Sequence, residues 1–496
     1  MRRFAPSREG LPIWSALGVM YALIAAAAIR SPLAAVILAG GLGILALLAV
    51  LLTRRGGLLA VMAALLVITL VLPGNMALAY RVPVGGGGIF IIDVLLGVLV
   101  AGALAAFLAQ GRLSVPRCPA TPALAAFMAW MIAAAALGLV RGMDLKFVLA
   151  DVRALSYYLL YFVILVSVRD RRAVVFLLKV LAVCLVADFA VGAFYYAIGQ
   201  GSATEFVEAG ISRFPAPHDI FLGGLLLLAT WVIVWPTGRR RPRILWILLA
   251  VALTGLMLSL VRGYWVALVV GLVYLFISTR TSQRVKLVMG TILIALLFAA
   301  VTAAVNVALL ESIFTRAMAI TAIQDQNVQY RLIENRAAWL QVREQPLLGQ
   351  GLGTPYLFDR SRYGVAPEYK YYIHNNYLWF LQRMGAVGLG LFAWFIVAFL
   401  VTTRRLPPGS ENADPWLSGL VRGARVMIVG LLVASITSPQ FNTKENMAAI
   451  TTVVGLAVVA RSWLVRSAEK DPADGHEATV GPSTSAFGAL NARSSE

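Results

Sequence analysis

The sequence contains few of the residues that cross-link small domains or bind metal ions. Among 496 residues there are two cysteines and three histidines. Cys118 lies beside a basic loop and Cys184 lies inside an apolar run, so the chain offers neither a disulfide framework nor a CxxC metal site. Charged residues make up only 13% of the chain, whereas hydrophobic residues make up 60%. This composition excludes an ordinary water-soluble domain and predicts an integral membrane protein.

Long apolar runs are instead the dominant feature of the chain. About 20 residues with a rise of 1.5 Å each cross the hydrocarbon core of a bilayer, and most of these runs are near that length. We therefore predict an all-α polytopic membrane protein with about 12–14 transmembrane helices, the first of them retained rather than cleaved as a signal peptide. The predicted spans are 12–29, 33–52, 57–79, 88–109, 122–140, 154–168, 173–198, 217–236, 243–261, 263–279, 285–308, 375–402, 421–437 and 447–464.

Basic residues give these spans their predicted orientation. The formal net charge is +19, but Lys and Arg occur as short clusters at helix ends, a distribution that indicates membrane topology rather than nucleic-acid binding. Most of the 42 Lys and Arg fall on the side of the N-terminus. The positive-inside rule then predicts both termini in the cytoplasm and one long polar loop, residues 309–374, on the outer side.

The long outer loop is predicted to contain amphipathic helix. Residues 329–346, QYRLIENRAAWLQVREQP, place Ile333, Ala337 and Leu340 on one apolar stripe. Such a helix is expected to lie along the membrane surface. The GQGLG that follows lacks the Lys and Ser/Thr of a phosphate-binding loop, so we interpret it as a turn.

His374 is the first residue of HNNYL, where the polar loop becomes an apolar helix. The positive end of a helix dipole favours a neutral histidine that accepts a proton near pH 7, which makes His374 a candidate general base. The alternative is an interfacial histidine that precedes two helix-capping residues, Asn375 and Asn376. Arg383, deeper in the same span, must face the bundle interior or a wet cavity, and we expect it to form a structural rather than a catalytic pair with Asp188.

Arg262 stands in SLVRGYW, between two spans with almost no loop. Its guanidinium is therefore held near the apolar boundary, either as a fixed fork for phosphate oxygens or as an arginine that pairs with lipid headgroups. A second outer segment, GISRFPAPHDIFLGG, contains Arg213, His218 and Asp219. Asp219 is a candidate cap for the helix that follows, so this segment also has a purely structural interpretation.

The predicted outer face also lacks two common catalytic motifs. It has no Asp-x-Asp pair to hold a metal-bound diphosphate, and it has no Ser nucleophile elbow. Metal-dependent glycosyl transfer of the usual kind therefore has no evident ligands, and we predict neither a metal ion nor a cofactor.

Taken together, these segments resemble the signature of the O-antigen ligase and polymerase family of bacterial membrane proteins. The resemblance extends over about residues 205–395 and fits the order and spacing of the motifs. The residues that carry it are Arg331, PLLGQGLG from Pro346, HNNYL from His374, Gly385 and Gly388, with SLVRG around Arg262 and SRFPAPHDIFLGG around Arg213 upstream.

The resemblance divides the chain into four parts. They are N-terminal transmembrane helices (1–204), a ligase-like catalytic region with the loop 309–374 (205–402), C-terminal transmembrane helices (403–466) and a disordered cytoplasmic tail (467–496). It further implies a bacterial inner-membrane protein whose active face is periplasmic.

Family membership also implies the reaction. The enzyme would pass a glycan from undecaprenyl diphosphate to a sugar hydroxyl of lipid A-core or of another glycan, by inverting, metal-independent transfer. Arginines would stabilise the leaving diphosphate, and a base would activate the acceptor. We therefore predict that Arg213 and Arg262 bind the diphosphate and that His374 activates the acceptor hydroxyl. The residues predicted to support or bind the substrates are Arg331, Arg336, His218 and Asn375.

Three alternatives stay open at this point. A polysaccharide polymerase would use the same chemistry with a different acceptor. A polysaccharide transporter or flippase is compatible with many spans and buried charges, although the polar residues gather on one face rather than at the midplane. A scaffold protein would have no evident use for the outer arginines and histidines.

Overall fold

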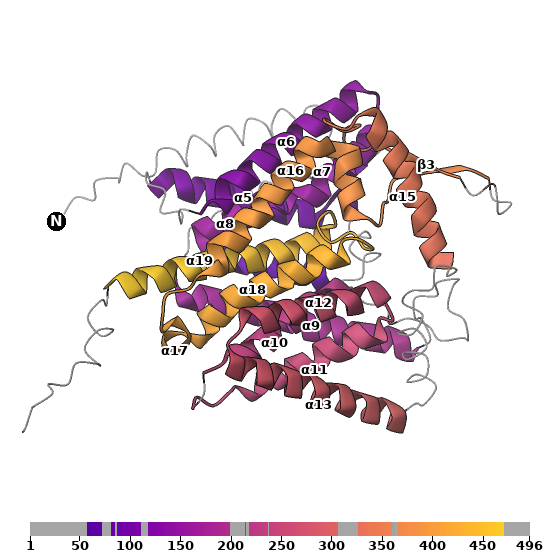
Figure 1. The fold of residues 1–496 in the computed structure, drawn as a ribbon. Helices are drawn as coiled ribbons and strands as arrows, with labels where there is room; N and C mark the ends of the chain where they lie inside the picture. Colours follow the sequence, from indigo (N-terminus) through magenta and orange to yellow (C-terminus); the bar gives the residue numbers. More distant parts are fainter. Residues whose placement is uncertain are drawn as a thin grey trace, which may run out of the picture.

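The computed structural model describes residues 57–71, 81–84, 87–110, 118–198, 214, 218–236, 238–305, 326–359, 361 and 366–470. The predicted spans 12–29 and 33–52 and nearly all of the tail 467–496 lie outside these residues. Within them the chain is almost entirely helical. Helices α18 (Pro415–Ala434) and α19 (Lys444–Lys470) lie at the centre, between α6 and α16 on one side and α10 to α13 on the other (Figure 1).

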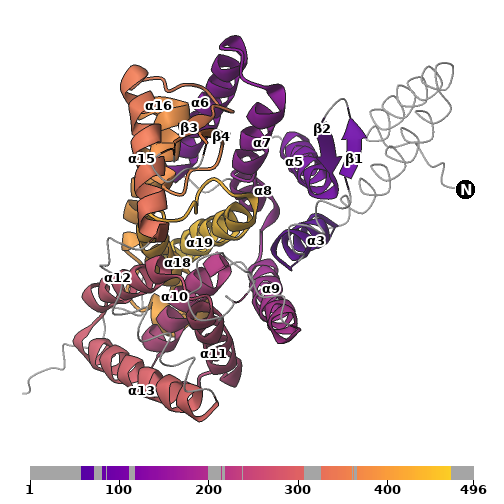
Figure 2. The same ribbon diagram turned by 90° about the vertical axis from the view of Figure 1, so that its right-hand side faces the viewer.

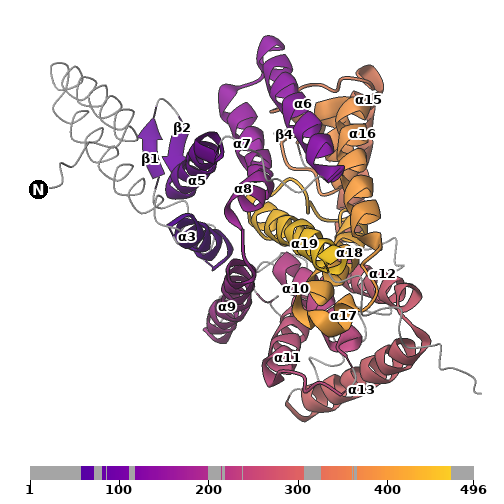
Figure 3. The same cartoon turned by 90° about the vertical axis from the view of Figure 1, so that its left-hand side faces the viewer.

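The remaining elements are further helices, most of which overlap predicted spans, and two short hairpins. The other helices are α3 (Gly57–Val71), α5 (Ile91–Gln110), α6 (Ala120–Val140), α7 (Leu145–Ser156), α8 (Leu159–Ser167), α9 (Arg171–Ala197), α10 (His218–Val234), α11 (Arg243–Leu258), α12 (Arg262–Ser278), α13 (Thr281–Val305), α15 (Gln326–Glu344), α16 (Asn376–Arg404) and α17 (Ser410–Ala413). Two antiparallel hairpins pair β1 (Arg81–Val84) with β2 (Gly87–Phe90) and β3 (Tyr356–Phe358) with β4 (Glu368–Lys370). The first hairpin lies with α3 and α5 at one flank, and the second lies beside α15 (Figure 2 and Figure 3).

The described helices confirm an all-α polytopic membrane protein. Seven segments are long and apolar enough to cross a membrane by length and composition, and α3, α10, α11 and α12 are shorter apolar helices. The seven are Ile91–Leu108, Ala120–Val140, Leu145–Ser167, Arg171–Ala197, Asn376–Arg404, Pro415–Ala434 and Lys444–Glu469. Every predicted span from 57–79 onward overlaps a helix.

Several predicted boundaries are wrong because polar caps decide where helices begin. The span predicted from 88 begins at Ile91, where Phe90 N donates to the side chain of Asp93 at 3.1 Å. The span predicted from 421 begins at Pro415, because the Asp414 side chain accepts from two backbone N–H groups of the first turn. The predicted loop 404–425 is therefore shorter than expected.

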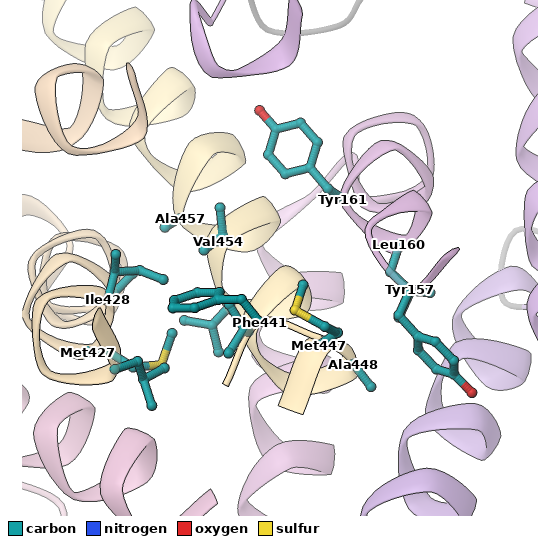
Figure 4. Packing of buried hydrophobic residues seen from close by; sticks show 14 of the residues in the cluster. Tyr157, Leu160, Tyr161, Met427, Ile428, Phe441, Met447, Ala448, Val454 and Ala457 are labelled. Atoms are coloured by element: carbon teal, nitrogen blue, oxygen red, sulfur yellow. The ribbon is translucent and has the colours of Figure 1, made fainter. Parts of the chain in front are cut away.

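Close helix contacts hold the centre together. Phe441 lies between Met427 of α18 and Met447 and Val454 of α19 (Figure 4), and its ring centroid is 5.0 Å from that of Phe392 on α16. A Cβ added at Gly423 would lie 2.4 Å from Leu227 Cδ1 of α10. Glycine here therefore lets α18 pack closely on α10 without displacing Leu227, as in other tightly packed membrane helices.

Helix α15 confirms a helix in the long loop but corrects its orientation. Glu334, Ala338 and Val342 are its buried residues, one turn apart, whereas Leu340 is 53% exposed. The predicted stripe is therefore wrong at Leu340. The protein-facing side of α15 includes the buried carboxylate of Glu334. A pattern of apolar residues alone does not predict a side that contains a carboxylate.

The GQGLG segment is a turn, as predicted, and it joins two helices. Gly351 N donates to Arg383 O of α16 at 3.0 Å, and Leu352 N donates to Ala134 O of α6 at 3.0 Å. Gly351 has φ +95°, and a Cβ there would lie 2.4 Å from Gly138 N. This loop fixes the chain between α15 and α16 and so places both ends of the candidate site described next.

Candidate functional site

His374 and Glu334 form the centre of the candidate site. His374 Nδ1 lies 2.9 Å from Glu334 Oε2, and His374 N also donates to Glu334 Oε1. The His374 side chain is 30% exposed, whereas that of Glu334 is 1% exposed. An ionised carboxylate only accepts hydrogen bonds, so Nδ1 carries the ring proton and the Nε2 lone pair is directed elsewhere.

A tyrosine completes the support of Glu334. The hydroxyl of the buried Tyr356 in β3 has two acceptors within reach of its one proton, Glu334 Oε2 at 3.3 Å and Tyr372 O at 2.9 Å. Burial raises the pKa of Tyr356 above its ordinary value, and the Glu334 carboxylate raises it further, so this hydroxyl stays a donor. Tyr356 of β3 and the backbone and ring of His374 thereby hold Glu334 and fix its orientation.

The asparagines after His374 have different roles. Asn375 caps α16, because its side-chain oxygen accepts from Tyr377 N at 3.1 Å and Leu378 N at 3.2 Å. Asn376, predicted as a second cap, is instead the first helical residue, and its Oδ1 accepts from Phe441 N at 2.6 Å. The Asn376 side chain thereby attaches the 435–443 connection to the first turn of α16. It satisfies the buried backbone N–H of Phe441.

Arg331 joins the same site from α15. It precedes Glu334 by three residues, so the two side chains lie on one side of the helix. Burial lowers the pKa of Arg331 below its ordinary value, the Glu334 carboxylate raises it, and the charge of Arg262 lowers it. Arg262 and Arg331 are thus electrostatic neighbours, and an anion between two such guanidinium groups would be stabilised.

A strained turn presents Arg262. It is the first residue of α12, and only Ser259, Leu260 and Val261 separate it from the end of α11. The buried Leu260 has φ +53°, and Val261 N donates to Ser259 Oγ at 3.3 Å. A bulky residue adopts a positive φ only where its surroundings compel it, so this turn defines the direction in which α12 begins.

A polar cluster lies behind Arg262. The Tyr264 hydroxyl donates to Asp219 Oδ1, lies 2.9 Å from Ser438 Oγ and accepts from Gln440 Nε2 at 3.2 Å. Asp219 was a candidate cap, but it lies inside α10 and its carboxylate binds Tyr264. The cluster connects α10 and α12 to the 435–443 connection, and so to the head of α16.

The comparison with known families agrees with this geometry. Residues 247–393 match the family model described as O-antigen ligase. The chain carries an O-antigen ligase domain. That domain contains Arg262, Arg331, Glu334 and His374, which come together in space. A search of curated proteins finds no match. The family and the apolar helices make this chain a multi-pass membrane enzyme of polysaccharide assembly.

The O-antigen ligase domain also contains the buried Arg383, whose predicted partner is wrong. Its Nε donates to Asp151 Oδ2 of α7 at 2.7 Å, and its Nη2 donates to Tyr371 O at 2.6 Å. Asp188 of α9 is buried, and its Oδ2 has no hydrogen-bond partner among the described residues. Arg383 pairs with Asp151 rather than Asp188 because the loop after α15 joins α6 and α16. Gly353 N of that loop also donates to Asp151 at 2.7 Å. Arg383 therefore fixes the segment between β4 and His374 through its bond to Tyr371 O.

Other predicted residues are placed only in part. Arg213 lies outside the described residues, and His218 begins α10 with a side chain that is likewise outside them. Phe214 is described, and its N donates to Leu258 O at 3.3 Å, just before the Arg262 turn. Arg336 is exposed on α15. Among the described residues, no group of three or more His, Cys, Asp and Glu is arranged to hold a metal ion.

Two residues of the candidate site were not predicted from the sequence. Glu334 sits in the predicted amphipathic helix, and Tyr356 follows the GQGLG turn. The available signal for Glu334 was a carboxylate one helical turn after Arg331 on an otherwise basic segment. That signal names no partner, since His374 is 40 residues away and only the α15–α16 contact brings the two together.

Proposed function

We propose that this protein transfers a glycan from undecaprenyl diphosphate to a sugar hydroxyl at the periplasmic face of the bacterial inner membrane. The observation that carries the proposal is the Glu334–His374 pair at 2.9 Å, next to Arg331 and Arg262. A base and two cations are what a single displacement at an anomeric carbon requires when the leaving group is a diphosphate.

His374 acts as the general base in this proposal. Its Nε2 accepts the proton of the acceptor hydroxyl as that oxygen attacks the anomeric carbon. The imidazolium that forms is stabilised by the Glu334 carboxylate, which also holds the ring in the required tautomer. Asn375 keeps the start of α16 helical beside this ring, and its side-chain oxygen is already engaged in that cap.

The arginines act on the other side of the displacement. The bond from the anomeric carbon to the diphosphate oxygen breaks with its electrons on that oxygen, so negative charge grows on the leaving group. Arg262 and Arg331 stabilise this charge as preorganised donors. Arg213, His218 and Arg336 remain proposed contacts to the diphosphate or the glycan. One backside displacement inverts the configuration at the anomeric carbon.

The acceptor separates ligase from polymerase. A ligase passes the glycan to lipid A-core, and a polymerase passes it to another lipid-linked glycan. The base and cations serve both, and the family match favours the ligase. A deletion strain distinguishes the two, because loss of a ligase leaves polymer on the lipid carrier, whereas loss of a polymerase leaves single repeat units.

Purified protein in detergent, given lipid-linked donor and acceptor, tests the reaction itself. We expect glycosylated acceptor with wild-type protein and with Arg343→Ala, an exposed control on α15. His374→Ala and Arg262→Ala should abolish most transfer. Near-normal transfer by either variant would contradict the assignment. A transporter would give no product, because detergent leaves no compartments to connect.

A further inference from the structure

A group of arginines lies at the ends of α12 and α16 that are remote from the candidate site. Arg425 of α18 donates through Nη1 to Arg404 O at 3.3 Å and through Nη2 to the hydroxyl of Tyr274. Arg404 is the last residue of α16, and Tyr274 lies one turn before the end of α12. Both helices begin at the candidate site, so Arg425 lies near the opposite membrane face. Figure 1 shows α17 at that end of the helices and α15 at the other.

The charge of Arg425 is not balanced within the described part of the protein. Its two acceptors, a carbonyl and a hydroxyl, are both neutral. The ion pairs described at this end join Arg171 to Asp414 and Arg422 to Glu411, and neither includes Arg425. Its Nε is buried and has no hydrogen-bond partner among the described residues. A charge on a membrane-spanning helix normally has a partner, so Arg425 calls for an anion.

Two further arginines share this position with Arg425. Arg422 lies one turn before it on α18 and pairs with Glu411 of α17. Arg280, two residues beyond the end of α12, and Arg425 are both near enough to Arg422 to repel its charge. We call Arg280, Arg422 and Arg425 the cationic cluster. Glu411 supplies one negative charge to these three guanidinium groups, which leaves an excess of two positive charges.

Apolar surface lies beside the cationic cluster on two helices. On α12, Val269 and Val273 are 59% and 50% exposed, and on α16 Val397 and Val401 are 56% and 66% exposed. The two valines of each helix are one turn apart and form a stripe that runs toward the cluster. Such stripes on membrane-spanning helices contact acyl chains. A ligand with both a phosphate and acyl chains therefore matches this surface better than a free anion does.

We infer that the cationic cluster binds the phosphate of an anionic phospholipid whose acyl chains lie along α12 and α16. Guanidinium groups bind phosphate oxygens as a fork, and basic pockets between membrane helices are suited to anionic headgroups. A zwitterionic headgroup brings its own cation and leaves the excess charge of the cluster in place. The lipid lies in the leaflet away from the candidate site, which is the cytoplasmic leaflet in the proposed function.

The bound lipid would connect helices that also build the candidate site. Helix α12 carries Arg262 at its other end, and α16 begins just after His374. A phosphate held by Arg280 after α12 and by Arg425 of α18, which binds the end of α16, joins these three helices electrostatically. Anionic phospholipid should therefore stabilise the folded protein more than zwitterionic phospholipid does.

Four substitutions separate the cluster from net charge. Arg280→Gln and Arg425→Gln each remove one positive charge, and Arg280 is exposed, so its replacement leaves the packing intact. Arg425→Lys keeps the charge without the fork. Arg240→Gln is the matched control, because Arg240 is exposed in the connection between α10 and α11 at the same end of the molecule. Monodispersity and thermal unfolding in detergent alone check that each variant is folded.

The test compares phosphatidylglycerol with phosphatidylcholine of the same acyl chains, by native mass spectrometry and thermal unfolding in detergent. We expect the wild type and Arg240→Gln to bind phosphatidylglycerol at least fivefold more tightly and to unfold at a higher temperature with it. Arg280→Gln and Arg425→Gln should each weaken this binding about tenfold, and Arg425→Lys less than about threefold, because charge-assisted hydrogen bonds to phosphate are strong. Binding of phosphatidylcholine should be the same in all variants.

Three results would overturn the lipid site. One is unchanged phosphatidylglycerol binding by folded Arg280→Gln and Arg425→Gln, and another is an equal loss in Arg240→Gln, which would assign the effect to net charge. The third is equal stabilisation by inorganic phosphate, which would assign the cluster to a free anion. These assays contain no glycan donor, so failure of glycosyl transfer would contradict the proposed function and leave the lipid site standing.

Discussion

Two pairs of a carboxylate with a basic side chain lie at the two ends of the segment from Tyr371 to Arg383. Arg383 and Asp151 are 0% and 16% exposed, and the guanidinium donates to Asp151, Gln382 and Tyr371. The His374 side chain is 30% exposed, and among the described residues its ring is hydrogen-bonded through Nδ1, to Glu334. The first pair is therefore bound into the protein on several sides, whereas the second leaves Nε2 of the ring without a hydrogen-bond partner among the described residues, as our proposed mechanism requires.

This difference assigns separate roles to two basic groups nine residues apart. A buried guanidinium with Asp151, Gln382 and Tyr371 as partners positions the chain. A partly exposed imidazole with one buried carboxylate is suited to proton transfer. Substitutions at the two pairs should therefore affect different measurements.

The largest expected effect is on catalysis by the His374–Glu334 pair. His374→Ala should lower kcat by about 10²–10⁴-fold, the usual contribution of general acid–base catalysis. Thermal stability should fall only modestly, because Glu334 loses the Nδ1 hydrogen bond but keeps the backbone N–H of residue 374 as a donor. Transfer assays on purified protein measure the first quantity. A variant that unfolds along with its loss of activity would contradict the division of roles.

The buried pair should give the largest effect on stability. Arg383→Met leaves Asp151 without its cation, and breaking one side of a buried pair costs about 3–5 kcal/mol. Unfolding in a denaturant series measures this loss. Arg343→Met, at an exposed position of α15, is the control. The double variant Arg383→Met with Asp151→Leu should recover part of the stability. Full stability of Arg383→Met would show that the pair is dispensable.

A smaller effect is expected at the carboxylate of the catalytic pair. Glu334→Gln keeps the shape and an acceptor oxygen but removes the charge that stabilises the imidazolium. We expect kcat to fall about 10–100-fold, or roughly 1.4–2.7 kcal/mol at 1.4 kcal/mol per tenfold, while KM stays within twofold. Glu344→Gln, at the exposed end of α15, should behave as wild type. A change confined to KM would indicate that Glu334 binds substrate instead.

The smallest effect is expected at the cap between the two pairs. Asn375→Ala should cost about 0.5–2 kcal/mol of stability, since two N–H groups of α16 lose their acceptor. Asn375→Ser retains a capping oxygen and should restore most of it. Calorimetry in detergent gives the stability change. If both variants instead raise KM equally with unchanged stability, Asn375 contacts the substrate rather than the helix.

Much of the architecture was predictable because it depends on local hydropathy. Twenty apolar residues must be helical to satisfy their backbone in a bilayer, so helices such as α9 and α16 follow directly from the sequence. Helix starts were less accurate, because Asp414 caps α18 ahead of its apolar run and Asp93, in the first turn of α5, binds the backbone N–H of Phe90. The two hairpins were not predicted, since β3 and β4 are three residues each and lie within a polar loop.

The candidate site was predictable in its members and not in its pairings. His374, Arg262 and Arg331 are recognisable as polar residues at helix ends and in a family-like order. Their partners depend on how each helix is rotated about its axis, which hydropathy does not specify. Glu334 meets His374 across 40 residues, and Arg383 meets Asp151 rather than Asp188 across 232.

The sequence by itself determined that this is a multi-spanning membrane protein with a long polar loop and a histidine at the head of α16. Those features follow from the cost of placing polar backbone and charge in hydrocarbon, which acts on each segment separately. Only the tertiary structure decided that α15 turns a carboxylate inward and that the GQGLG turn joins α6 to α16. Each depends on contacts between distant segments, and packing rather than composition selects those contacts.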